Sequence, residues 1–502
     1  MVFNSYEFAL FLPIVLGLYW ILRHRQQNLL LLVASYVFYG AWDYRFLGLM
    51  ATSTVTDYVV GRLLASTEDE RRRKRIFLVS LAVNLGILGF FKYFNFFVDS
   101  GADLLRALGF EANPTTLRIL LPVGISFYTF HGISYTFDVY RREIEPVHRF
   151  LDFALFVSYF PQLVAGPIGR AQVQLPQFEH PRRRPSWDQI RSGVFLILLG
   201  LFKKIAIADA LASTVNSAFA NASRVSAATL LLGVYGFALQ IYGDFSGYSD
   251  IARGTSRLFG IELLKNFDQP YLSRNITDFW RTWHISLSTW LRDYLYVPLG
   301  GNRKGRFATY RNLMVTMLLG GLWHGAAWGF VVWGGLHGAY LCVHRAISRK
   351  ARRTTPIGGS LDDTPGDTDA TDAKPDEEVR APHTAPPPRF HLLRDFWPAL
   401  LTFHLVCFAW IFFRAESFDQ AADVITGILS FRRGAPGLDG MLLVGLGGLA
   451  IFLIDLYQRN GGSETAILRA PALVRGAFYG LLATAIIVFS GGSPVPFIYF
   501  QF

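Results

Sequence analysis

The chain has 502 residues, of which 52% are hydrophobic and only 17% are charged, and its mean hydropathy is +0.30. Soluble domains carry about 25% charged residues, so this composition excludes an ordinary soluble enzyme and favours a polytopic helical membrane protein. The net charge of +11 comes from short basic clusters between apolar runs, a pattern typical of membrane topology and contact with anionic lipid. No nucleic-acid partner is expected, because no basic, aromatic-rich soluble domain is present.

Apolar stretches close to the roughly 20 residues needed to cross a bilayer recur along the chain. The first, 6–22, lacks a preceding basic region and carries Glu7, so it is predicted to be a span and not a cleaved signal peptide. The pattern predicts an all-α fold, a polytopic membrane bundle with broken or re-entrant helices. The predicted segments are 6–22, 28–47, 49–64, 76–97, 118–138, 150–166, 191–209, 227–246, 312–344, 393–413, 440–457 and 473–490.

Basic clusters alternate with these segments and are predicted to face the cytoplasm. A pair of crossings separates the first three clusters, which is consistent with an N-terminus on the outer side. Segment 150–166 has basic loops on both sides and contains Pro161 and Gly166, so it is predicted to be broken or re-entrant. The clusters are Arg23 with Arg25, 71–75, Arg141 with Arg142, 182–184, 303–306 and 345–353.

Residues 351–392 differ in composition from the rest of the chain, because they are acidic, rich in proline and poor in apolar residues. This composition predicts a disordered cytoplasmic loop between a membrane core, 1–350, and further membrane helices of the same domain, 393–502. Loops accept added length at little cost, so a tolerated insertion is favoured over a regulatory element. Removal of residues 355–388 is therefore expected to be tolerated.

The strongest functional signal is a pair of histidines in apolar, aromatic surroundings. His324 lies in segment 312–344, which is long enough to cross the membrane twice or to enter and return. Basic loops on both sides place it near the far turn or the middle of that excursion. An ionisable group inside a bilayer is by default a functional candidate, and histidine can move a proton near neutral pH. A structural histidine bonded to a backbone carbonyl is an equal alternative.

His284 lies on a predicted amphipathic helix over about 276–296. A tryptophan-rich helix of this kind is typical of a membrane interface. Periodicity alone slightly favours an aromatic belt in which His284 merely contacts headgroups. Two neighbouring faces recur at helical spacing, one with Trp283, Leu287, Trp290 and Tyr294 and one with Trp280, His284 and Ser288.

Other polar residues in apolar runs are predicted to have structural roles. Asp244 and Asp250 flank small residues, and they are predicted to cap a helix that starts near Ser249, in preference to acting as catalytic carboxylates. His131 and His337 are predicted to be packing or hydrogen-bonding residues. The chain contains no HExxH or similar metal-ligand spacing and no Gly-x-Ser-x-Gly elbow, so neither a metal nor a tightly bound cofactor is expected.

The simplest chemistry for two histidines that face one cavity is general-base catalysis. One histidine takes the proton from a hydroxyl group while that oxygen attacks an acyl carbonyl. No covalent acyl-enzyme is needed, which agrees with the absence of a recognisable nucleophile.

The chain resembles the membrane-bound O-acyltransferase family, and within it the branch that contains the alginate O-acetyltransferase membrane protein. The likeness covers almost the whole chain except 351–392. It is carried by WRTWHISLS at 280–288, WLRDYLYVPLGGN at 290–302, Asn312, GGLWHG at 320–325, LPVGISFY at 121–128, FPQLVAGPI at 160–168, DFSGYSD at 244–250 and FIYFQF at 497–502.

This resemblance implies a bundle of membrane helices around a central tunnel. His324 matches the family's near-invariant catalytic histidine, and His284 matches its second, more variable position. The resemblance also leads us to expect five residues to line the substrate tunnel: Trp283, Ser288, Trp323, Asp244 and Tyr248.

The family transfers acyl groups to hydroxyls, and members of this branch act in the O-acetylation of secreted polysaccharides such as alginate. The expected donor is acetyl-CoA or another acetyl donor on the cytoplasmic side of a bacterial inner membrane. The expected partners are a periplasmic acetyltransferase and the polysaccharide export machinery, within the lipid bilayer.

Other acceptors stay open: teichoic acid in D-alanyl transfer, peptidoglycan, a cyclic glucan or a lipid. A proton-coupled transporter or flippase is disfavoured, because transporters usually show paired repeats and none is found here.

Overall fold

The computed structural model describes residues 1–111, 119–164, 166–354, 388–491 and 496–498, and the secondary structure within these ranges is entirely helical. Five helical runs in these ranges are long and apolar enough to cross a membrane. This confirms an all-α polytopic membrane protein. The five runs are α4 to α5 (Glu70–Ala107), α12 (Ala227–Leu258), α17 (Leu392–Arg414), α19 (Leu438–Gly461) and α20 (Ala472–Phe489).

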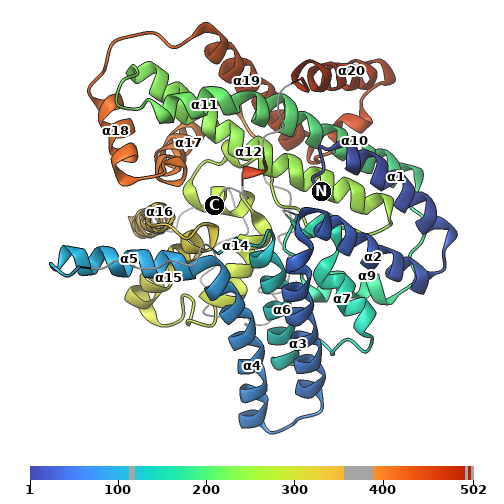
Figure 1. Ribbon diagram of the computed structural model, residues 1–502. Coiled ribbons are helices and arrows are strands. Elements are labelled where there is room, and N and C mark those ends of the chain that lie inside the picture. The colour runs from blue at the N-terminus through green and yellow to red at the C-terminus, as the bar shows by residue number, and fades with distance from the viewer. Residues whose placement is uncertain (112–118, 165, 355–387, 492–495, 499–502) are drawn as a thin grey trace.

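The N-terminal part is a group of helices held together by buried polar contacts as well as apolar packing. It comprises α1 (Tyr6–Ile21), α2 (His24–Asp43), α3 (Leu47–Ala65), α4 (Glu70–Leu88) and α6 (Ile125–Tyr140), with the short η1 (Tyr44–Phe46) after α2. Helices α3, α4 and α6 lie side by side (Figure 1). Between them, Asp57 accepts hydrogen bonds from Ser80 Oγ at 2.6 Å and Asn84 Nδ2 at 2.8 Å. Such polar contacts join helices where apolar packing alone gives little preference.

Two predicted segments are broken as expected. Segment 150–166 divides into α7 (Phe150–Ser158) and α8 (Phe160–Leu163), and the short α9 (Ala171–Glu179) follows. Segment 312–344 folds as two helices that pack against each other, α15 (Gly305–His324) and α16 (Trp328–Thr354). His324 is the last residue of α15, so of the two predicted positions, the turn and the middle of the segment, it occupies the turn.

Helix α12 crosses the centre of the molecule and packs along α10 (Trp187–Leu201), which continues as η3 (Phe202–Asp209) and α11 (Ala210–Ala220) (Figure 1). Glycines make this close approach possible. A Cβ added at Gly247 would lie 2.7 Å from the carbonyl oxygen of Gly200, and one at Gly193 would lie 2.9 Å from that of Gly254. Small residues at such crossings let two helix backbones come together in a membrane protein.

The predicted cap near Ser249 is wrong, because α12 runs without interruption from Ala227 to Leu258. Asp244 and Asp250 instead form ion pairs with lysines of η3. The predicted continuous helix over 276–296 is also wrong. It divides into α13 (Ile276–Thr282), α14 (Ile285–Leu291) and η5 (Arg292–Tyr296), with Trp283 and His284 at the break.

The predicted loop 351–392 is bounded by helices on both sides. Helix α16 extends to Thr354 and α17 begins at Leu392. Residues 355–387 lie outside the described residues, so their predicted disorder stays a prediction. The amphipathic α18 (Phe418–Leu429), which no predicted segment covered, follows α17, and the remaining short elements are η4 (Pro270–Leu272) and η6 (Ala466–Arg469).

A bulky residue in the α10–α12 contact is expected to destabilise the protein. Gly193→Leu places a side chain against the backbone of α12, and such overpacking costs about 1–3 kcal/mol. Gly476→Leu is the control, because a Cβ at Gly476 in α20 meets nothing within 4 Å. Thermal unfolding in detergent should show a lower melting temperature for Gly193→Leu only. Equal melting temperatures for both variants would contradict the close approach.

Candidate functional site

His324 ends α15 with its side chain buried and oriented by its own helix. Its Nδ1 lies 2.6 Å from the carbonyl oxygen of Gly320. Because a carbonyl oxygen can only accept, Nδ1 carries the hydrogen and the Nε2 atom carries the lone pair. The ring packs against Trp333 at 4.8 Å and Trp323 at 5.0 Å between centroids. The imidazole is thus held in the tautomer that a general base acting through Nε2 requires.

His284 is fully buried at the break between α13 and α14, and it has the opposite hydrogen-bonding character. Its backbone is left-handed, with φ of +43°, and its Nδ1 accepts from the Leu287 N–H at 3.4 Å. The Nε2 atom therefore carries the hydrogen, and it has no hydrogen-bond partner among the described residues. The His284 and His324 ring centroids are 6.4 Å apart. One imidazole acceptor and one imidazole donor thus lie next to each other.

Asn266 imposes the chain break at His284. Its backbone carbonyl oxygen accepts from the Ile285 N–H at 2.9 Å. Its side-chain Oδ1 accepts from the Ser286 hydroxyl at 2.7 Å and from the Ser286 N–H at 3.3 Å. These contacts satisfy the first amides of α14 from outside the helix. Sequence reasoning missed Asn266, since a single asparagine in a connecting segment shows no periodicity. The buried positions of Trp283 and Leu287, both 0% exposed, also show that their stripe packs inside the protein and not in an aromatic belt.

A third histidine borders the site. His337 on α16 is buried, and its Nδ1 accepts from Trp280 Nε1 at 3.2 Å, which agrees with the predicted hydrogen-bonding role. Trp333 lies between His337 and His324, with ring centroids 4.9 Å and 4.8 Å away. His131 lies apart and accepts from the Gly169 N–H at 2.9 Å.

Of the five residues predicted to line a tunnel, three lie beside the histidines in the chain and two lie on α12. The first three are Trp283, Ser288 and Trp323. Trp323 contacts both histidines, whereas Trp283 precedes His284 and packs into an aromatic cluster with Phe279 and Trp410. Ser288 donates its Oγ hydrogen to the Trp283 carbonyl oxygen at 3.1 Å. The tunnel itself stays a prediction.

Asp244 and Tyr248 lie on α12 together with Phe245, whose ring centroid is 4.6 Å from that of His284. Asp244 is 2.9 Å from Lys204 Nζ and accepts from the Ile498 N–H at 2.7 Å. Tyr248 stacks on Phe3 at 4.6 Å. These two residues therefore join the chain's two ends to α12.

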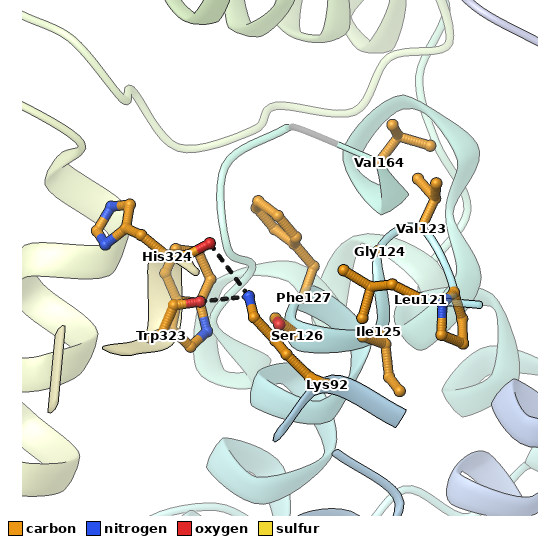
Figure 2. A pocket seen from close by; sticks show the side chains of 11 residues that line it. Lys92, Leu121, Val123, Gly124, Ile125, Ser126, Phe127, Val164, Trp323 and His324 are labelled. Atoms are coloured by element: carbon orange, nitrogen blue, oxygen red, sulfur yellow. Dashed lines mark hydrogen bonds between the residues drawn. The ribbon is translucent and has the colours of Figure 1, made fainter. Parts of the chain in front are cut away.

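A cavity of about 50 Å³ lies between the end of α15, the start of α6 and Lys92 (Figure 2). The Lys92 ammonium donates to the carbonyl oxygens of Trp323 at 2.5 Å and His324 at 3.2 Å, and Tyr93 Oη donates to Leu322 at 3.0 Å. The π-helical turn η2 (Gly89–Tyr93) presents both side chains. The His324 imidazole points away from Lys92 while its carbonyl points toward it (Figure 2).

Lys92 thus caps the helix that ends in His324, because a cation satisfies terminal carbonyls and complements the helix dipole. Sequence reasoning missed this residue. The available signal was a lysine inside the apolar segment 76–97, which is costly in a membrane unless paired.

Comparison with known proteins identifies the family. The profile of the membrane-bound O-acyltransferase family matches residues 141–358, a range that contains both His284 and His324. A probable alginate O-acetylase of Pseudomonas putida is 40% identical over 100% of both chains. This chain belongs to the membrane-bound O-acyltransferase family.

Two other relatives place the chain within this O-acyltransferase family. A probable alginate O-acetylase of Azotobacter vinelandii is 43% identical over 86% of this chain and 78% of its own length. A peptidoglycan O-acetyltransferase of Helicobacter pylori is 34% identical over 94% of this chain and 86% of its own length. The resemblance inferred from the motifs is therefore confirmed, and so is the expectation of a membrane acyltransferase.

Loss of the Lys92 ammonium should destabilise the end of α15. Lys92→Met removes a hydrogen-bond donor from two carbonyls, and an unsatisfied buried acceptor costs about 1–3 kcal/mol. We expect a lower melting temperature in detergent for this variant. Lys74→Met, on the exposed side of α4, is the matched control and should melt like the wild type. A wild-type melting temperature for Lys92→Met would show that the cap contributes nothing.

Proposed function

We propose that this protein is the membrane O-acetyltransferase that supplies acetyl groups for O-acetylation of a secreted polysaccharide, with alginate as the first polymer to examine. The observation that carries the proposal is the full-length similarity to a probable alginate O-acetylase. The His284–His324 pair supports it, since one imidazole can take a proton and the other can donate a hydrogen bond.

In the proposed reaction, His324 Nε2 accepts the proton of an acceptor hydroxyl as that oxygen attacks the acetyl carbonyl carbon. The His284 Nε2–H donates a hydrogen bond to the carbonyl oxygen as negative charge develops there. Collapse of the tetrahedral intermediate breaks the bond to the donor. For a thioester donor such as acetyl-CoA, the His324 imidazolium then protonates the leaving thiolate. An acetyl ester and a thiol are formed, and both histidines return to their starting state.

The proposed setting is the inner membrane of a bacterium, with the acetyl donor on the cytoplasmic side. The basic clusters, including 71–75 and 182–184, support this orientation because positive charge is retained on that side. A periplasmic acetyltransferase and the polysaccharide export machinery are the proposed partners that complete transfer to the polymer.

A second acceptor is favoured by one specific observation. The Helicobacter pylori relative is named as a peptidoglycan O-acetyltransferase and matches 94% of this chain. Cell-wall glycan is therefore the next acceptor to examine if exopolysaccharide acetylation does not depend on this protein.

Substitution of His324 should abolish the reaction. General-base catalysis typically contributes about 10²–10⁴-fold to a rate, so His324→Ala should reduce the O-acetyl content of extracted exopolysaccharide to the level of a deletion strain. His404→Ala is the control, because that histidine is exposed on α17 and bonds Tyr235 away from the site. Both variants should be present in the membrane at the wild-type level. Full acetylation by His324→Ala would exclude it as the base.

Substitution of His284 should cause a large but smaller loss. Removal of a single hydrogen-bond donor to an oxyanion costs about 10²–10³-fold in rate, so His284→Ala should acetylate measurably only after long incubation. The initial rate of acetyl-ester formation in membranes supplied with acetyl-CoA measures this effect. A His284→Ala variant with the wild-type rate would remove His284 from the mechanism.

A further inference from the structure

A second cavity, of about 270 Å³, lies between α12, α17 and α19, with η4 closing one side. Its lining is almost wholly apolar and includes Phe390, Phe403, Val444, Gly448 and Phe452. It is separate from the histidine pair. Tyr271 lines the cavity and its ring lies 6.0 Å from Trp283, which in turn precedes His284.

The cavity is a groove that follows α19. The α19 residues that line it share one helix face, and they are Val444, Gly448, Ile451, Phe452 and Asp455. From Val444 to Asp455 this face extends about 16 Å, at about 1.5 Å per residue. A face of that length lined mainly by apolar side chains suits an extended hydrocarbon chain.

The surroundings of the groove are those of a lipid-facing surface. Three of its walls, α12, α17 and α19, are candidate membrane spans. The same two outer helices, α17 and α19, expose large apolar side chains, such as Leu401 at 64%, Leu446 at 64% and Leu453 at 53%. Exposed apolar side chains on membrane-spanning helices face hydrocarbon, so two helices that line the groove also form part of the surface toward the bilayer.

One end of the groove is polar and cationic. Phe390 lines this end, and its backbone N–H donates to Asn460 Oδ1 at 2.9 Å. The first turn of α17 carries Arg394, which is 61% exposed and lies 2.9 Å from the buried Asp395. Arg274 lies 3.9 Å from the same carboxylate, so the arginines outnumber it. Arg389, next to Phe390, is also exposed. The opposite end, at Tyr235, Phe403 and Val444, is apolar.

We propose that this groove binds one hydrocarbon chain of an anionic glycerophospholipid from the bilayer, with the lipid phosphate at the Arg389–Arg394 edge. The apolar length accepts the chain, and the arginines attract the negatively charged headgroup. Gly448 provides the space, because any larger side chain there projects toward Leu239 on the opposite wall, 3.3 Å from an added Cβ.

The test compares lipid retention by Gly448→Leu and Gly445→Leu. Gly445 lies on the same helix, but a Cβ there meets nothing within 4 Å, so it is a matched control outside the groove. Each full-length protein is purified in detergent, and its bound phospholipid is counted by native mass spectrometry. Phosphatidylglycerol is then added and the melting temperature is followed, because a ligand that binds only the folded state raises it.

We expect the wild type and Gly445→Leu to retain one phospholipid and to gain stability when phosphatidylglycerol is added. Gly448→Leu should lose both effects. Equal retention and an equal temperature shift in Gly448→Leu and Gly445→Leu would overturn the proposal.

The headgroup contact has a separate test that does not alter the groove's interior. The variant Arg389→Gln changes an exposed side chain and leaves the Arg394–Asp395 ion pair intact, so it keeps the test valid if Gly448→Leu does not fold. It should need a several-fold higher phosphatidylglycerol concentration for the half-maximal temperature shift and should respond to phosphatidylcholine as the wild type does. An unchanged phosphatidylglycerol response would refute the anionic headgroup site.

Discussion

The ion pairs between two buried lysines and the carboxylates of α12 are the interactions on which the centre of this protein depends. Lys203 Nζ lies 2.8 Å from Asp250, and Lys204 Nζ lies 2.9 Å from Asp244 and 2.7 Å from Asp209. A charge left unpaired in an apolar interior costs about 3–5 kcal/mol. Because η3 presents both lysines along α12, this helix continues through the carboxylates instead of ending at them. The same alignment holds Phe245 against His284.

The histidine site, in contrast to the continuous α12, depends on helices that are interrupted, at the end of α13 and at the end of α15. Irregular backbone inside a membrane protein persists only where other groups satisfy its amides and carbonyls. Asn266 satisfies the amides that begin α14, and Lys92 with Tyr93 satisfies the carbonyls that end α15. The residues that permit the two breaks therefore also fix where the two histidines lie. The contacts of the two imidazoles with backbone groups determine which ring nitrogen accepts and which donates. The His324 ring contacts the Gly320 carbonyl, and the His284 ring contacts the Leu287 N–H.

A series of packed aromatic side chains connects the histidine pair with the groove between α17 and α19. Trp283 packs against Trp410 at 5.2 Å, and Trp410 stacks on Trp333 at 5.6 Å. Trp333 contacts His324 at 4.8 Å between ring centroids, and Trp283 lies 6.0 Å from Tyr271, which lines the groove between α17 and α19. Rigid aromatic side chains of this kind bury a large area and hold a fixed geometry.

The sequence by itself determined the membrane class, the break in 150–166, the return of 312–344 and the two histidines as the candidate site. These follow from local composition, from proline and glycine positions and from motifs, all of which act over short stretches of chain. Only the tertiary structure decided three further features. These are the break at His284, the continuity of α12 past Asp244 and the cap on His324 by Lys92, which is 232 residues away in the chain. Each depends on a polar group brought from a distant segment to satisfy another in an apolar interior, and no local pattern records that pairing.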